Sequence, residues 1–475
     1  MVRWKPRLVC PLALPLLIVG AYGLAPGRLL AQVAGGGLRT TVNGVVGGSC
    51  SSGLCSVSGG TAAGANLFHR FSSFDTRGSI SGVSIQNAGF RNVLVGVTAP
   101  QGTFIDKPVS LSTPGNLFWL SPGGIALSGS GGFVNTIQLT LSTATSQRIG
   151  EGRFDVFGTT PQQAALLPGT PEVGAKDLVL DPTVRALAGM APDPQIVLNG
   201  ITLTVDRSLL VDNPGGLVSV AGSSLSAAAS SGVGGSITLT GQQVWVDGLS
   251  SLLATGPNGG GLIQVGGSWQ NSDPSVRQAV QTWIGNGALL DASATVKGNG
   301  GTVVAWSDVK NPESATAVGG TLLAKGGFEA GDGGRIETSG HWLNVNGIQV
   351  STLAPRGTSG VWLLDPNNLK ILPGSGNDSN IAVVTGSSVT TFAADPAQPD
   401  SVLYDTSIAS ALAAVSAVEI VAGGNISFSP SGSSATGSTP IILGSSSLSN
   451  PSITFKAGGD INVDQTVVFY SHDGG

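Results

Sequence analysis

Short apolar runs that alternate with polar residues recur along the chain from about residue 36. In each run Val, Ile or Leu takes every second position, and Thr, Ser or Gln stands between them. This period of two predicts β-strands with one buried and one solvated face. Gly pairs and Ser/Asn clusters separate the runs, as is typical of turns between short strands. The clearest runs are 201–205, 236–240, 243–246, 302–306 and 343–346.

Gly-Gly pairs stand at positions 215, 234, 300 and 319, so the step from the first pair to the second equals the step from the third to the fourth. A repeated unit of about 20 residues is typical of a solenoid, in which each unit buries its apolar face only against its neighbours. The leucine-rich repeat pattern is absent, and stacked parallel strands fit the apolar runs better. The chain is therefore predicted to be all-β, a parallel β-helix with ~20 residues per coil and roughly 16 coils between residues 40 and 365.

Three segments break this pattern. Residues 160–195 are Pro-rich and are expected to leave the rod, with a short helix at 182–187. Asp273 and Pro274 begin a segment whose apolar spacing of three and four predicts an amphipathic helix up to residue 284. Helical spacing at 406–414 predicts another helix, followed by a strand at 418–421. Residues 36–70 are expected to cap the N-terminal end, since an open solenoid end pairs with other chains.

Residues 1–31 form a separate unit. Three basic residues precede an apolar run over 8–25, and Ala31 offers a small residue at a cleavage point. This order predicts a secretory signal peptide. A transmembrane anchor is the weaker alternative, because Pro11 and Pro15 interrupt a short run. Elsewhere no apolar run reaches the ~18 residues that a membrane-spanning helix needs, so the mature chain is not expected to span a membrane.

Composition narrows the class of function. Charged residues make up only 10% of the 475, and the net charge is −5. A nucleic-acid partner needs clustered Lys and Arg, so none is expected. Few charges and few aromatic residues also suit passage of an unfolded chain through a narrow pore.

Cys50 and Cys55 are the only cysteines after the signal region. In an exported protein a pair at this spacing predicts a small local disulfide. Zinc binding is the weaker alternative, because no His or second Cys pair lies near in the sequence.

Groups suited to catalysis are sparse, and no metal site or cofactor is expected. His69 lies among phenylalanines and is expected to be packed, whereas His341 is expected at the edge of a coil and His472 in a frayed tail. Four aspartates have roughly the spacing that a polysaccharide-acting β-helix enzyme would need. Most of them border turns, which favour Asp in any case. The chain is therefore expected not to be an enzyme, with the polysaccharide-acting enzyme as the alternative. The four are Asp247, Asp273, Asp291 and Asp308.

Five strings, taken in order, resemble the N-terminal secretion domain and following coils of filamentous haemagglutinin-like exoproteins, over about residues 32–372. They are GANLFHRF at 64–71, NLFWLSPGGI at 116–125, GGTVVAW at 300–306, GDGGRIETSG at 331–340 and LLDPNNL at 363–369. The family usually has Asn-Pro-Asn-Gly-Ile where this chain has Ser121-Pro122-Gly123-Gly124-Ile125. Pro122 and the glycine before Ile125 retain the turn chemistry.

The resemblance implies a right-handed parallel β-helix with an N-terminal cap. It implies export through the periplasm and then through a partner outer-membrane β-barrel transporter, the two-partner secretion system. Residues 32–270 would form the secretion domain, 271–372 further coils, and 373–475 a C-terminal β-rich repeat segment that need not be complete. The residues that match the secretion motifs are Asn66, Leu67, Phe68, Asn116, Pro122, Gly124 and Ile125.

The function expected from the resemblance is that of a secreted or cell-surface exoprotein in adhesion or aggregation. Its ligand would be a surface or glycan that the sequence does not identify. A third possibility, after the polysaccharide-acting enzyme, is the N-terminal part of a toxin-delivery exoprotein.

Overall fold

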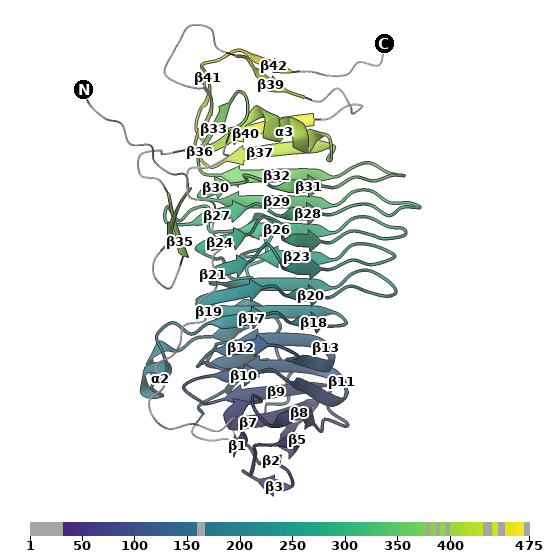
Figure 1. Cartoon of the computed structure of the whole chain (residues 1–475), viewed down its shortest axis with the longest axis vertical. Helices are drawn as coiled ribbons and strands as arrows, with labels where there is room; N and C mark the ends of the chain where they lie inside the picture. Colours follow the sequence, from purple (N-terminus) through teal and green to yellow (C-terminus); the bar gives the residue numbers. More distant parts are fainter. Residues whose placement is uncertain are drawn as a thin grey trace, which may run out of the picture.

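The computed structural model describes residues 32–158, 167–376, 381–385, 390–394, 400–430, 439–444 and 452–469. The predicted signal peptide and His472 lie outside these residues. The described chain is all-β with parallel sheets. Its strands form layers that follow one another in sequence order, from purple at the N-terminal end to yellow at the C-terminal end (Figure 1). Each layer pairs with the layers before and after it, so most contacts join neighbouring layers.

Three faces surround the core. On the first face, strands from successive layers pair in parallel, and the longer strands bend so that their other halves reach a second or third face. The first-face strands are β7 (Asn66–Asp75), β9 (Asn92–Val97), β11 (Pro108–Leu120), β13 (Gly132–Ser142), β19 (Ser208–Ala221), β21 (Ser236–Val246), β23 (Leu262–Val265), β26 (Thr302–Trp306), β29 (Arg335–Gly340), β32 (Val361–Pro366), β37 (Ala417–Ala422) and β40 (Ser452–Ala457).

The other two faces are built from shorter strands, joined by the bent halves of the long strands. The second face contains β10 (Thr103–Ile105), β12 (Ile125–Ser128), β17 (Ile196–Asn199), β24 (Gln281–Ile284), β27 (Ala315–Val318) and β30 (Trp342–Asn344). The third face contains β5 (Gly53–Gly59), β8 (Ile80–Ile85), β18 (Thr202–Thr204), β20 (Ser224–Ser226), β22 (Ser251–Leu253), β25 (Leu289–Asp291), β28 (Thr321–Leu323) and β31 (Gln349–Ser351).

The first layers are covered by antiparallel strands, unlike the rest of the stack. β1 pairs with β7, and β2 pairs with β5, both in antiparallel fashion. These strands occupy the backbone groups that the first layer would otherwise expose. All but β1, which begins before residue 36, lie within the segment for which a cap was predicted. The strands are β1 (Val33–Gly37), β2 (Thr40–Val42), β3 (Val45–Val46), β4 (Ser49–Cys50) and β6 (Thr61–Ala63).

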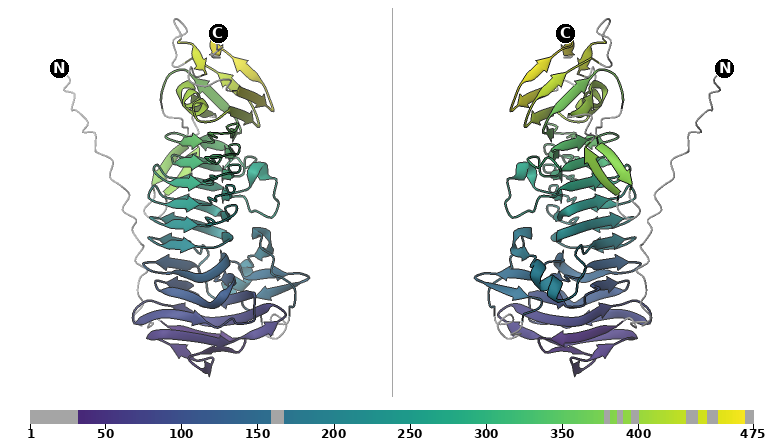
Figure 2. Two further views of the ribbon diagram at one scale, coloured as in Figure 1. Left: turned by 90° about the vertical axis from the view of Figure 1, so that its right-hand side faces the viewer. Right: turned by 90° about the vertical axis from the view of Figure 1, so that its left-hand side faces the viewer.

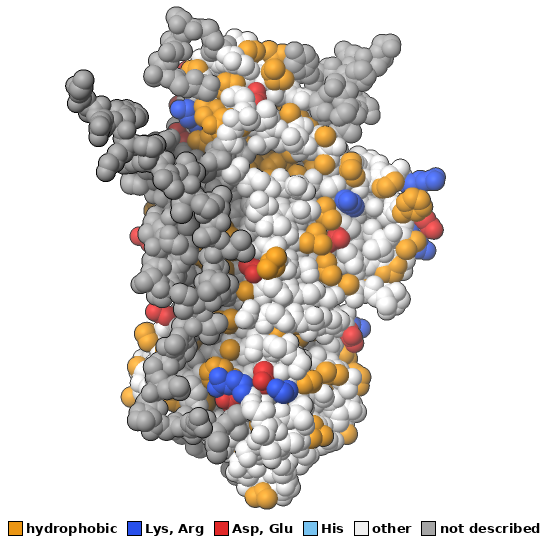
Figure 3. All heavy atoms as spheres, viewed as in Figure 1, with side chains coloured by type: hydrophobic (Ala, Val, Ile, Leu, Met, Phe, Trp, Pro, Cys, Tyr) orange, Lys and Arg blue, Asp and Glu red, His pale blue; other side chains and the backbone are white. Residues whose placement is uncertain are grey.

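One hydrophobic core runs through the layers. Inward positions hold aligned aliphatic side chains, for example Leu209, Ile237, Ile263, Val303 and Ile336, which are all fully buried. Each of these residues is the second residue of its paired segment, so the predicted alternation and the parallel register place them in one column. On the face shown in Figure 3, few of the described side chains are charged.

A column of glycines marks the corner at which the chain enters the first face. Gly235, Gly261, Gly301, Gly334 and Gly360 each come directly before a first-face strand. In each of the last four, an added Cβ would overlap the carbonyl oxygen of the column's preceding glycine. Each backbone N–H in the column donates to the carbonyl of the residue that follows the third-face strand, as in Gly301 to Ala292 at 2.8 Å. Loops of varying length project between these two points (Figure 1).

The predicted coil of ~20 residues is wrong, because every step between successive column glycines is longer than that solenoid unit. The steps are also unequal: the steps to Gly261 and to Gly360 are the shortest, and the step to Gly301 is the longest. The pairs at 215 and 319 lie elsewhere, the first inside β19 and the second between β27 and β28. The described part of residues 40–365 has ten first-face strands, β7 to β32, and not sixteen coils. Corner loops and side excursions lengthen each layer without changing the register of the strands.

Three excursions leave the stack. The predicted helix at 182–187 is confirmed as α2 (Pro182–Leu187), which lies beside the stacked layers (Figure 2). The Asp181 carboxylate caps it by accepting from the Thr183 and Val184 amides. The predicted helix at 406–414 is confirmed as α3 (Asp405–Leu412), followed by β37. The excursion elements are β14 (Ser146–Ile149), β15 (Gly152–Asp155), η1 (Ala175–Asp177), β16 (Leu178–Val179), α2, η2 (Trp269–Asn271), β34 (Ile381–Thr385) and β35 (Thr390–Ala394).

The helix predicted for residues 273–284 is wrong. The Asp273 carboxylate accepts the Ser275 amide at 2.8 Å, which closes a turn rather than starting a helix. Trp283 and Ile284 then lie in β24, between strands β21 and β27. Cross-strand pairing therefore overrides the local helical spacing of the apolar residues.

The C-terminal layers continue the stack, and the first-face strand pairing continues across residue 372 from β32 to β37. The remaining strands of this end are β33 (Leu369–Leu372), β36 (Ser401–Tyr404), β38 (Ile426–Phe428), β39 (Ile441–Leu443), β41 (Ile461–Val463) and β42 (Val467–Phe469).

Among the described residues, no helix has the length and apolarity needed to cross a bilayer.

The glycine column provides a test of the stacking geometry. In a Gly301→Ala variant the new Cβ would overlap the Gly261 carbonyl, so the layers must shift. We expect a loss of about 1–3 kcal/mol, as for other overpacked sites, measured as a lower thermal midpoint and faster hydrogen exchange in β26. Gly132→Ala is the matched control, because its Cβ would lie 3.6 Å from the nearest atom, the Thr202 carbonyl oxygen. Equal effects in the two variants would contradict this account.

Candidate functional site

Two of the predicted secretion-motif residues, Asn66 and Asn116, belong to one asparagine ladder. Asn66, Asn92 and Asn116 occupy the same register position at the start of β7, β9 and the second half of β11. The Asn92 Nδ2 donates to Asn66 Oδ1 at 2.8 Å, and the Asn116 Nδ2 donates to Asn92 Oδ1 at 2.9 Å. The Asn66 Nδ2 in turn donates to the Leu167 carbonyl at 3.1 Å. The ladder therefore satisfies buried amide groups across three layers and ties them to the excursion.

The two residues after Asn92, and the two after Asn116, lie in different hydrophobic cores. Leu117 belongs to the main core, as does Val93 at the same position of β9. Phe68, Leu94 and Phe118 align on the outer side and are buried in a second hydrophobic core. That second core is completed by the excursion, and Phe68 and Phe154 of β15 have ring centroids 5.4 Å apart.

Asn92 was not among the predicted site residues. A signal for it was nevertheless present, because Asn92-Val93-Leu94 repeats the pattern of an asparagine and two large apolar residues found at 66–68 and 116–118. The sequence separations between the three asparagines, 26 and then 24, equal the length of one layer here. Phe154 had no comparable signal, since only the folding back of the excursion brings it to Phe68.

The second predicted string, residues 121–125, forms a turn stacked on an earlier turn. Gly124 N–H donates to the Ser121 carbonyl at 2.9 Å, just as Gly102 N–H donates to the Ala99 carbonyl at 3.0 Å. The Ser121 hydroxyl accepts from Thr103 Oγ1 at 3.0 Å and donates to the Gly124 carbonyl at 2.8 Å. Serine thus supplies side-chain hydrogen bonds where the family string has its first asparagine.

Gly123, which replaces the second asparagine of the family string, lies in close contact with the turn below. An added Cβ at Gly123 would be 2.5 Å from the carbonyl oxygens of Ala99 and Pro100. No real Cβ approaches a carbonyl so closely, so this stacking requires glycine. Gly123 therefore differs from the family string at a position where two turns stack too closely for a side chain.

All seven predicted secretion-motif residues are buried in the folded chain. A partner that meets the folded protein would touch other residues. In the folded state these residues hold the first layers together.

Cys50 and Cys55 are joined by a disulfide with their Cα atoms 5.7 Å apart. Both side chains are in the main core, where the disulfide joins β4 to β5 at the N-terminal end.

The described residues contain no group of three or more His, Cys, Asp or Glu side chains placed to hold a metal ion.

His69 lies in β7 next to the ladder and is fully buried. Within the described part of the chain, neither ring nitrogen has a hydrogen-bond partner. Burial lowers the pKa of His69 from 6.5 to about 4, because the charged imidazolium would be desolvated. His341, in contrast, is half-buried, and its Nδ1 lies 3.0 Å from the Val309 carbonyl oxygen.

The four aspartates with coil-like spacing all serve turns. Each carboxylate bonds with the backbone N–H two residues further on, at 2.8 to 3.1 Å: Leu249 for Asp247, Ser275 for Asp273, Ser293 for Asp291 and Lys310 for Asp308. This is the usual side-chain-to-backbone turn of Asp. Each of these carboxylates therefore has a local structural role.

Two other carboxylates are fully buried, and both anchor the segment between β23 and β24. Asp212 Oδ1 accepts from the Arg277 guanidinium at 3.1 Å, while Arg277 also donates to the Ala175 and Leu178 carbonyls of the other excursion. Glu337 Oε2 accepts the Gln270 amide at 2.8 Å. Burial raises the pKa of Asp212 to about 6 and that of Glu337 to about 7.

Comparison with known proteins was made at the level of sequence and of structure. No family model and no curated protein matches the chain. The crystal structure of the HMW1 secretion domain from Haemophilus influenzae is similar at 16% sequence identity and a TM-score of 0.32, with 70% of this chain and 98% of that chain covered. A TM-score this low does not establish a shared fold.

Breaking the ladder should destabilise the first layers. Asn92→Ala would leave Asn66 Oδ1 and Asn116 Nδ2 buried without partners, which costs about 1–3 kcal/mol. We expect a lower denaturation midpoint and faster hydrogen exchange in β7 and β11. The exposed Asn258 is the control, and Asn258→Ala should leave both unchanged. If Asn92→Ala exchanged like the unaltered protein, the ladder would not be stabilising.

His69 should make the first layers sensitive to acid. Its pKa is lower in the folded chain than the unfolded value of 6.5, so the unfolded chain binds more protons between pH 6.5 and about 4. Stability is therefore complete above pH 6.5 and falls by about 3 kcal/mol as the pH drops to 4. His69→Phe should remove this dependence, as followed by hydrogen exchange of β7 against pH. His341→Gln should preserve it, and an unaltered profile in His69→Phe would refute the assignment.

Proposed function

We propose that this chain is the exported exoprotein of a two-partner secretion system, with the right-handed parallel β-helix that the sequence resemblance implies. It would pass through the periplasm and a partner outer-membrane β-barrel transporter, and act in adhesion or aggregation outside the cell or at its surface. The single observation that supports this most is that the strings resembling the secretion domain assemble into one unit. They form the asparagine ladder, the second core and the stacked turns of the first layers.

The layered contacts support the proposed export in an unfolded state. Each first-face strand pairs with the strands of adjacent layers, so a layer can fold once its predecessor has formed. The antiparallel N-terminal strands and the ladder would provide the first folded template outside the cell. The disulfide joins two cysteines that lie close together in the sequence, which adds little bulk to an extended chain.

The proposal includes no catalytic step. The four regularly spaced aspartates bond to their own turns, and the two buried carboxylates hold the segment between β23 and β24. A catalytic carboxylate pair normally lies in a cleft with access to substrate.

Export is tested by expressing the chain in a Gram-negative host with and without its partner transporter. We expect the protein in the culture medium only when the transporter is present, with equal synthesis in both cultures. Export that is independent of any outer-membrane transporter would overturn the proposal.

Paired asparagine variants then separate two roles for the buried motif residues. Asn116 belongs to the resemblance and Asn92 does not, but both are in the ladder. If the motif acts by forming the first folded layers, Asn92→Ala and Asn116→Ala should reduce the amount in the medium to a similar extent, with synthesis unchanged. A loss in Asn116→Ala alone would instead indicate recognition of the unfolded chain, and Asn258→Ala serves as the control for both.

A further inference from the structure

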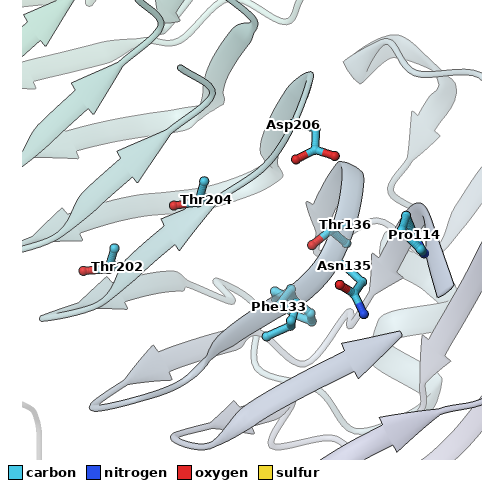
Figure 4. A pocket seen from close by; sticks show the side chains of 8 residues that line it. Pro114, Phe133, Asn135, Thr136, Thr202, Thr204 and Asp206 are labelled. Carbon is cyan, nitrogen blue, oxygen red and sulfur yellow. The ribbon is translucent and has the colours of Figure 1, made fainter. Parts of the chain in front are cut away.

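A hollow of about 350 Å³ lies between β13 and β18, where the third face is interrupted (Figure 4). The third-face strands before it pair as β8, β11 and β13, and those after it pair from β18 onward. Among the described residues, no ladder joins β13 to β18. Asn135 bends β13 here with a φ of 61°, and its Nδ2 donates to the Leu111 carbonyl at 2.8 Å. The hollow is therefore a built feature of the strand and not a gap between loops.

One wall holds a buried hydroxyl without a partner. Thr136 is 4% exposed, and its Oγ1 has no hydrogen-bond partner in the described part of the chain. In Figure 4 this hydroxyl points across the hollow toward β18. Leaving a buried hydroxyl unpaired is costly, and a ligand hydroxyl in the hollow would satisfy it.

The other lining groups provide both polar and apolar contacts. Thr202 and Thr204 present exposed hydroxyls from β18, and the Asp206 carboxylate lies at the end of the hollow next to Thr136. Pro114 and the half-exposed Val134 supply apolar surface. A sugar ring has this same combination, with hydroxyl groups at its edge and C–H groups on its faces. The volume is near the lower end of small-molecule sites, which span ~300–1,000 Å³, and suits a single ring.

The charge of the lining selects a neutral ligand. Its eight residues include no Lys or Arg, so a phosphate, sulfate or carboxylate would find no counter-ion. Asp206 is the only carboxylate among them, and a lone carboxylate is a weak site for Ca²⁺, which takes six to eight oxygen ligands. As an acceptor, however, the Asp206 carboxylate can accept two hydrogen bonds from neighbouring sugar hydroxyls.

A hydroxyl-rich surface continues from the hollow along the third face. Thr202, Ser224 and Ser251 are in register in consecutive layers, and so are Thr204 and Ser226. Successive layers are ~4.8 Å apart, which is close to the length of one sugar unit. Further rings of a linear glycan could therefore meet a serine or threonine in each layer.

We propose that this hollow binds one ring of a neutral glycan through Asp206, Thr136 and Thr204, with the rest of the glycan lying across the Ser/Thr surface of β18, β20 and β22. This names the ligand class for the proposed adhesion role, on which it rests. The site itself requires only the folded chain, so binding and export can fail independently.

The test uses the purified full chain and ligand-observed NMR titrations with methyl glycosides of glucose, galactose, mannose and N-acetylglucosamine, and with their β-linked disaccharides. We expect at least one neutral sugar to bind and its disaccharide to bind more tightly. Asp206→Asn and Thr136→Val should each weaken binding at least tenfold. Thr136→Val replaces an unpaired hydroxyl by a methyl group of similar shape, so its thermal midpoint should be unchanged or higher.

Thr321→Val, on the same face but four layers from β18, is the matched control and should bind as the unaltered chain does. Glucose 6-sulfate and galacturonic acid test the charge argument and should bind less well than the neutral sugars. The proposal is overturned if no neutral sugar binds, if both hollow variants bind normally, or if the charged sugars bind best. Because these titrations involve no export, a chain that binds sugar but needs no transporter would refute the proposed secretion route alone.

Discussion

The close approach of successive layers at one corner is the constraint on which the rest of the structure depends. Parallel strands lie ~4.8 Å apart, and at this corner the backbone of one layer passes directly against the carbonyl of the layer before it. Gly261, Gly301 and Gly334 leave the space that a Cβ would fill. With the corner aligned, the strands that follow share one register, and their inward Val, Ile and Leu side chains form one continuous core. Loops between the third face and the corner can then vary in length without disturbing it.

The first layers are stabilised differently from the later ones. Their strands bury both sides, with Leu117 in the main core and Phe118 in the second core beneath the excursion. The asparagine ladder joins the same three layers through side-chain amides, each of which would be costly to bury alone. This end thus has apolar contacts on two sides, polar bonds between layers and antiparallel strands over its edge. It is suited to act as the template on which later layers assemble.

The excursions are held to the stack by a few buried charged groups. Arg277 joins Asp212 to two carbonyls of the η1–β16 excursion, and Glu337 holds the Gln270 amide. Charged residues are rare in this chain, so their placement at these anchors is informative. The hollow beside Thr136 and Asp206 is different, because the buried Thr136 hydroxyl has no partner in the described part of the chain and Asp206 is exposed at the edge of the hollow.

Much of the fold followed from local pattern. Period-two alternation identified strands such as 236–240 and 302–306, because it depends on neighbours in the sequence. The local helix signals, an Asp-Pro start and helical apolar spacing, failed at 273–284, where cross-strand pairing of Trp283 overrides helical spacing. The even spacing of the Gly-Gly pairs also predicted a wrong coil length, because some of these glycines lie at the corner of the layers and others do not.

What the sequence by itself determined is an all-β chain whose apolar runs must stack and whose turns are Gly- and Asp-rich. Only the tertiary structure decided which residues meet across layers. It placed Asn92 between Asn66 and Asn116, packed Phe68 against Phe154, and left Thr136 facing Thr204. These contacts join residues that are far apart in the sequence, as Phe68 and Phe154 are. They depend on the length of every intervening loop, which no local periodicity encodes.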